Sequence, residues 1–143
     1  MTCAPLWRRL TAMAYDILLL VAIWLCATAL LMLLSGGLLA DAARPAWLKI
    51  TEQLFLIATT YCFFIGFWTH GGQTLGMRAW RLQLVTTTGD PVSLAVASWR
   101  FVAALPSILA GGLGYLWALI DRERCTWHDR LTGTRVIVLP KQP

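Results

Sequence analysis

The chain has 143 residues, the length of one domain, and 58% of them are hydrophobic whereas only 13% are charged. This composition excludes an ordinary water-soluble globular protein and predicts an integral membrane protein. Twelve Lys and Arg residues against seven Asp and Glu residues give a formal net charge of +5. The uneven placement of these basic residues indicates how the chain is threaded through a bilayer.

Two apolar segments predict transmembrane helices, at about residues 15–37 and 50–69. Each approaches the roughly 20 residues that a helix needs to cross the hydrocarbon core. A secretory signal peptide is the alternative interpretation of the first segment, because Arg8 and Arg9 form a basic leader before it. The apolar run is too long for a signal peptide and carries Asp16 near its start, so we favour a membrane span.

A third apolar segment, at about residues 93–120, contains Pro106 and a glycine-rich stretch at 111–114. Proline and glycine predict a helix broken into two halves. The broken segment can be a re-entrant hairpin that returns to the same face, or a third complete span. Short strands predicted at about 82–88 and 134–139 favour the hairpin, because they can pair only if both lie on one side of the membrane.

The basic residues predict the orientation of the chain. Arg8 and Arg9 precede the first span, only Arg44 and Lys49 lie between the first two spans, and eight basic residues follow the second. Because basic residues remain in the cytoplasm, the amino terminus and the 70–100 segment are expected there. We therefore expect a single, mainly α membrane domain over the whole chain, with a small cytoplasmic β element.

Asp16 is a carboxylate at the cytoplasmic end of the first predicted span, and an ionised carboxylate in hydrocarbon needs a partner. Arg9 lies two helical turns earlier, on nearly the same face, but about 10 Å away along the axis. A direct pair between them is therefore not expected, and each should meet a group from another segment. The expected partners of Asp16 are Arg78, Arg100 and the backbone amides near residues 72–76.

Asp129 is expected to pair with Arg9, which would fasten the carboxyl-terminal part of the chain to the base of the first helix. One interpretation is that these charges are architectural and satisfy one another. The other is that Asp16 binds a cation or a proton beside unwound backbone at Pro106 or the glycine cluster, as in transporters.

The sequence GGQTLG at 71–76 lacks the G-K-[ST] ending and the G-x-G-x-x-G spacing of nucleotide-binding loops. We interpret it as a tight cytoplasmic turn in which Thr74 or Gln73 caps the following short helix. The residues of this turn motif are Gly72, Gln73, Thr74 and Gly76.

No catalytic or metal constellation is predicted. The adjacent His128 and Asp129 point about 100° apart on a helix, and no nucleophile is near them in sequence. The cysteines have no C-x-x-C spacing, so we expect free thiols; they are Cys3, Cys26, Cys62 and Cys125. We expect no enzymatic activity, no cofactor, no metal and no nucleic-acid partner.

Four blocks of the sequence together resemble the RDD family of bacterial membrane proteins. They are R-x-x-A-x-x-x-D at 9–16, GGQTLGMRAWRLQLV at 71–85, SWRF around Arg100, and WHDRLTGTRVIV at 127–138. The arginine and two aspartates that name the family would correspond to Arg9, Asp16 and Asp129. One departure is Met77, where the family usually has lysine.

The resemblance implies a multi-pass protein of the bacterial inner membrane that transports an ion or small solute, or belongs to a transport assembly. The alternative is a structural or assembly partner for other membrane proteins, without transport activity. One copy with two or three spans can barely enclose a path, so transport predicts a homo-oligomer in the lipid bilayer. Small residues at 27–29 and 110–114 are the candidate helix contacts.

Overall fold

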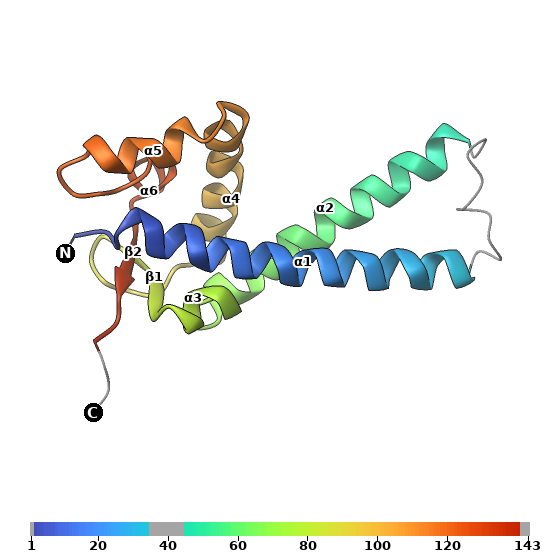
Figure 1. Ribbon diagram of the computed structural model, residues 1–143, viewed down its shortest axis with the longest axis horizontal. Helices are drawn as coiled ribbons and strands as arrows, with labels where there is room; N and C mark the ends of the chain where they lie inside the picture. Colours follow the sequence, from blue (N-terminus) through green and yellow to red (C-terminus); the bar gives the residue numbers. More distant parts are fainter. Residues whose placement is uncertain (1, 35–44, 141–143) are drawn as a thin grey trace. The chain divides into compact units, whose positions relative to one another are not determined.

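The computed structural model describes residues 2–34 and 45–140 (Figure 1). Its contacts divide the chain into two compact units. Unit 1 contains residues 1–16 and 64–143, and unit 2 contains residues 17–63. The division falls inside the two long helices, each of which contributes residues to both units.

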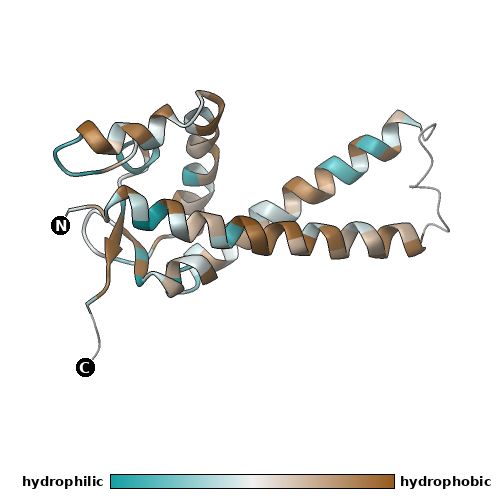
Figure 2. Ribbon diagram, in the orientation of Figure 1, coloured by the Kyte–Doolittle hydropathy of each residue, from teal (hydrophilic) through white to brown (hydrophobic). Residues whose placement is uncertain are grey.

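The two long helices are α1 (Leu6–Leu34) and α2 (Ala46–Thr69), and both are long and apolar enough to cross a membrane. They contain the predicted spans at 15–37 and 50–69, except that residues 35–37 lie outside the described part of the chain. Figure 2 shows how continuous the hydrophobic run along α1 is. The prediction of two spanning helices is confirmed.

The spanning helices bury little of their surface within the chain. In the most apolar stretch of each helix only 6% of the residues are buried. In unit 2, large side chains such as Leu18, Leu25 and Leu33 are exposed. These residues match a helix surface that is solvated by acyl chains or covered by another protein.

The small sheet of unit 1 consists of β1 (Leu82–Thr86) and β2 (Thr134–Val138), which are antiparallel. The register pairs Leu82 with Val138 and Thr86 with Thr134. The strands predicted at 82–88 and 134–139 are thus confirmed with slightly shorter bounds. Alternating Leu82, Leu84 and Val136 are buried, which gives the sheet one apolar face in the core of unit 1.

The broken third segment consists of α4 (Leu94–Leu109) and α5 (Leu113–Ile120), bent by 92°. Pro106 does not make the break, because it lies inside α4. The chain turns at Gly111 and Gly112, whose φ angles of 66° and 84° are in the left-handed region that glycine adopts readily. The described chain therefore has two spanning helices, or three if the bent pair counts as one span.

The segment between β1 and β2 begins and ends at the same sheet, as the re-entrant alternative requires. Helix α6 (Trp127–Thr132) follows α5 and leads into β2 through Gly133. The segment before α1 joins this structure, because the N–H of Ala4 donates to the carbonyl of Val136 at 2.6 Å. The first eleven residues of α1, 6–16, thus belong to unit 1.

Candidate functional site

Asp129 lies at the centre of a buried cluster of charges that joins three helices. Arg9 of α1 approaches Asp129 Oδ2 with its Nη1 at 2.8 Å, and Arg100 of α4 approaches Oδ1 with its Nη2 at 2.7 Å. At most 5% of each of these three side chains is exposed. We call Arg9, Arg100 and Asp129 the Asp129 cluster.

Threonine hydroxyls surround the Asp129 cluster. The guanidinium of Arg9 donates to Thr126 Oγ1 at 3.4 Å, and that of Arg100 donates to Thr134 Oγ1. Asp129 also caps its own helix, because the N–H of Thr126 donates to Asp129 Oδ2 at 2.9 Å. The carboxylate is therefore held by two cations and one backbone donor.

The electrostatics of the cluster keep Asp129 ionised. Burial alone would raise its pKa, but the guanidinium groups of Arg100 and Arg9 outweigh burial and hold the pKa of Asp129 well below its usual range. The pKa of neighbouring His128 is also lowered, to about 3, by burial and then by the charge of Arg100. His128 is thus neutral at cellular pH, with Nε2 3.0 Å from Thr126 Oγ1.

Asp16 forms a second buried site through neutral donors. The hydroxyl of Thr74 donates to Asp16 Oδ2 at 2.5 Å, and the N–H of Gly76 donates to Oδ1 at 2.9 Å. No Lys, Arg or His side chain of the described residues forms an ion pair with Asp16. We call Asp16, Thr74 and Gly76 the Asp16 site.

The Asp16 site fastens α3 (Leu75–Ala79) to α1. Thr74 is the N-cap of α3 and accepts from the N–H of Met77 at 3.1 Å. The same hydroxyl donates a hydrogen bond to Asp16, which also accepts a hydrogen bond from the N–H of Gly76. The first backbone N–H groups of α3, which have no acceptor within the helix, thus donate to its own N-cap and to a side chain from α1.

Glycines in the GGQTLG turn allow this close approach. A Cβ at Gly76 would meet the carbonyl oxygen of Ala12 and the carboxyl group of Asp16. A Cβ at Gly72, whose φ is 71°, would meet the carbonyl of Leu84. Between them, Gln73 donates from Nε2 to the Leu82 carbonyl at 2.6 Å, so the turn lies against β1.

Most of the predicted site residues take part in one of the two sites, but their pairing differs from the sequence analysis in two respects. Arg100 binds Asp129 and not Asp16. Arg78 is exposed on α3 and forms no ion pair with either carboxylate. Sequence reasoning missed Thr126 and Thr134; the only local signal was a threonine three residues before Asp129, the spacing of a helix cap.

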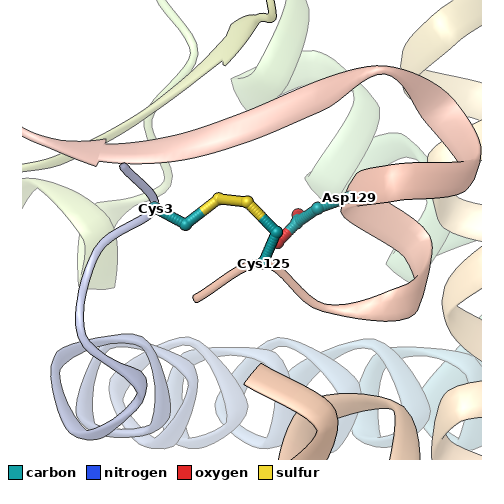
Figure 3. A group of neighbouring side chains, drawn as sticks. All are labelled: Cys3, Cys125 and Asp129. Carbon is teal, nitrogen blue, oxygen red and sulfur yellow. A yellow bond between two sulfur atoms is a disulfide. The ribbon is translucent and has the colours of Figure 1, made fainter. Parts of the chain in front are cut away.

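The cysteines correct a prediction. Cys3 and Cys125 form a disulfide across 122 positions, whereas Cys26 and Cys62 are free as expected. Asp129 lies within 4.8 Å of both bonded sulfurs (Figure 3). Three potential metal ligands thus converge there, but the sulfurs bind each other and so have no free thiolate to offer a metal ion.

The residues that correspond to the arginine and two aspartates of the family name, Arg9, Asp16 and Asp129, all lie at the two buried sites. No curated protein and no solved structure matches the chain significantly. The model of the RDD family matches residues 3–133, which is nearly the whole sequence. The chain therefore belongs to the RDD family.

Proposed function

We propose that this protein is a non-enzymatic assembly partner for other membrane proteins in the bacterial inner membrane. The observation that carries the proposal is that both buried carboxylates already bind groups of the protein itself. Both oxygens of Asp16 hold α3, and both oxygens of Asp129 hold arginines from other helices. Groups fixed in this way support an architectural role more than a mobile ion site.

The surface of the spanning helices supports the same role. Leu18, Leu25 and Leu33 are exposed in unit 2, and small residues occur at 27–29 in the same helix. Small residues let helices approach closely, and exposed leucines supply the contacts that lateral association in a membrane requires. The exposed surfaces of α1 and α2 would then contact a second copy or a different membrane protein.

The placement of basic residues supports a cytoplasmic unit 1. Ten of the twelve Lys and Arg residues belong to the sequence of unit 1, and only Arg44 and Lys49 belong to unit 2. Basic residues close to spans are retained on the cytoplasmic side. The amino terminus, the sheet and α6 would therefore face the cytoplasm.

Site-specific photo-crosslinking in native membranes tests the assembly role. A photoreactive residue replaces Leu25 or Leu33, and the matched control places it at Thr88, an exposed residue of the turn after β1. We expect one reproducible protein adduct from the helix positions and none from Thr88. Adducts with lipid alone from both leucine positions would contradict the proposal.

Transport of a cation or proton is the second candidate function, because Asp16 is the one buried carboxylate of unit 1 without an ion-pair partner among the described residues. A carboxylate held only by neutral donors can exchange a proton or cation more readily than one between two guanidiniums. Reconstituted protein should show no flux under the first proposal. Flux that Asp16→Asn abolishes in folded protein would select the transport function and imply an oligomer.

A further inference from the structure

Cys3 and Cys125 come from opposite ends of the sequence and meet in the interior of unit 1. Their Cα atoms are 5.4 Å apart, and at most 3% of either residue is exposed. Figure 3 shows the bonded sulfurs beside Asp129, at the point where the chain enters α6. The role of this pair is not explained by the two carboxylate sites.

Backbone hydrogen bonds hold the segment of Cys3 beside the segment of Cys125 independently of the S–S bond. The N–H of Cys3 donates to the carbonyl of Glu123 at 2.9 Å, and the N–H of Ala4 donates to Val136 at 2.6 Å. The segment before α1 is therefore docked between the α5–α6 loop and β2. The sulfurs would remain neighbours if the bond between them were reduced.

The compartment determines which form of the pair persists. The proposed function places unit 1 in the cytoplasm, and this step rests on that orientation. Thiol buffers of the cytoplasm keep most protein disulfides reduced, and persistent structural disulfides belong to oxidising compartments. A cytoplasmic dithiol whose two cysteines have Cα atoms only 5.4 Å apart is instead suited to reversible oxidation.

We propose that Cys3 and Cys125 are an oxidative modification site, a dithiol in ordinary growth that low-molecular-weight disulfides convert to the internal disulfide. One cysteine thiolate attacks a sulfur of the reagent, releases one thiolate and forms a mixed disulfide. The second cysteine thiolate then attacks the protein sulfur and releases the other reagent thiolate. The two protons of the cysteine thiols pass to the released thiolates, so the protein is oxidised by two electrons and the reagent is reduced by two.

A reagent has a route to the sulfurs in spite of their burial. Local opening of a folded domain gives reagents transient access to side chains that are buried on average. A cavity of about 160 Å³ is lined by Cys125 together with Thr87, Glu123 and Arg135. Local opening of the segment that carries Cys3 would join this cavity to the space that Cys3 leaves.

Oxidation would act on the Asp129 cluster. Cys125 is followed directly by Thr126, whose N–H donates to Asp129, and Cys3 precedes the helix that carries Arg9. The disulfide thus adds a covalent link between the two segments that the ion pair already joins. Closing so long a loop should raise the unfolding temperature by about 5 to 15 °C.

Thiol counting on the whole protein tests the site. In a Cys26→Ser/Cys62→Ser background only the proposed pair remains, so purified protein is reduced, treated with oxidised glutathione, and alkylated after unfolding. We expect both thiols to be lost together without added mass. The matched variant Cys3→Ser should retain one glutathione at Cys125 and lose the rise in unfolding temperature. Two separate glutathione adducts in the parent, or an unchanged unfolding temperature on oxidation, would overturn the proposal.

The same background in cells tests reversibility and orientation separately. Acid-quenched cells should contain the reduced pair, and a pulse of a thiol oxidant such as diamide should convert it to the disulfide. A pair that is oxidised without the pulse overturns the proposal, and accessibility of Thr88→Cys to an impermeant maleimide then identifies the cause. External labelling means that the orientation is wrong, whereas protection means that the bond is a permanent cytoplasmic disulfide.

Discussion

Asp129 and Asp16 are both buried in unit 1, with 1% and 3% of each residue exposed, yet their surroundings differ in charge. Asp129 faces two guanidiniums, whereas Asp16 faces a hydroxyl and a backbone N–H. A carboxylate that neutralises buried cations stabilises them as well as itself, because an unpaired buried charge is energetically costly. Asp16 accepts only from neutral donors, so its loss leaves no buried cation without a counter-charge.

The largest expected effect is that of Asp129→Asn. This change keeps the side-chain volume but leaves Arg9 and Arg100 buried without a counter-charge. Breaking a buried charge pair on one side costs about 3–5 kcal/mol. We expect a loss of that size in the free energy of unfolding, measured by chemical denaturation in detergent.

The control for Asp129→Asn is Glu123→Gln, which removes a half-exposed carboxylate 3.0 Å from Arg135. An exposed pair of this kind contributes at most about 1 kcal/mol. Adding Arg9→Met to Asp129→Asn should recover part of the loss, because one stranded cation disappears with it. Equal losses in Glu123→Gln and Asp129→Asn would show that the cluster is not the electrostatic centre of unit 1.

Gly76→Ala should have the next largest effect, because the added methyl group disrupts the Asp16 site by steric overlap without removing a hydrogen-bonding group. The added methyl group meets the Ala12 carbonyl and the Asp16 carboxyl group, so α3 must move away from α1. Overpacking of this kind costs about 1–3 kcal/mol. The matched control is Gly66→Ala in α2, where nothing lies within 4 Å and alanine should be neutral or slightly stabilising.

Asp16→Asn should cost less than Asp129→Asn. The amide oxygen can still accept from Gly76, but the hydroxyl of Thr74 loses its charged acceptor. Loss of one hydrogen bond to a charged group corresponds to about 1.5–3 kcal/mol, and the remaining bond places the expected loss near the lower limit. Denaturation of both variants under one condition checks the order, and a larger loss for Asp16→Asn would reverse the comparison.

The spans and strands were predictable because hydropathy and alternation are local properties of the sequence. The partner of Asp16 was not, since three candidate donors existed and only the fold brings Gly76, sixty positions away, within reach. In the sequence analysis the break in the third segment is attributed partly to Pro106, but α4 continues through this proline. Gly111 and Gly112 make the turn, since their positive φ angles suit glycine. Proline alone is a weak sign of a break, because a helix near a membrane can accommodate it. Cys3 and Cys125 carry no local sign of their pairing, because it depends on how both ends of the chain dock.

The smallest expected effect is the loss of stability on lowering the pH from 7.5 to 5.5, which arises at His128 beside the Asp129 cluster and not at the Asp16 site. In the folded protein the pKa of His128 is about 3, below its ordinary value of 6.5, so the unfolded chain binds the proton first. Stability is therefore complete above pH 6.5 and falls as the pH is lowered toward 3, by about 1.4 kcal/mol per pH unit. Asp129 stays ionised in this window because its own pKa is lowered.

Denaturation at pH 7.5 and pH 5.5 measures this dependence, and the expected loss of about 1.4 kcal/mol is attributed to His128 by substitution. His128→Gln should flatten the dependence, because glutamine can hydrogen-bond to Thr126 without titrating. His70→Gln, at an exposed histidine after α2, should leave it unchanged. If His70→Gln flattens the dependence and His128→Gln does not, the loss of stability does not arise from protonation of His128 beside the Asp129 cluster.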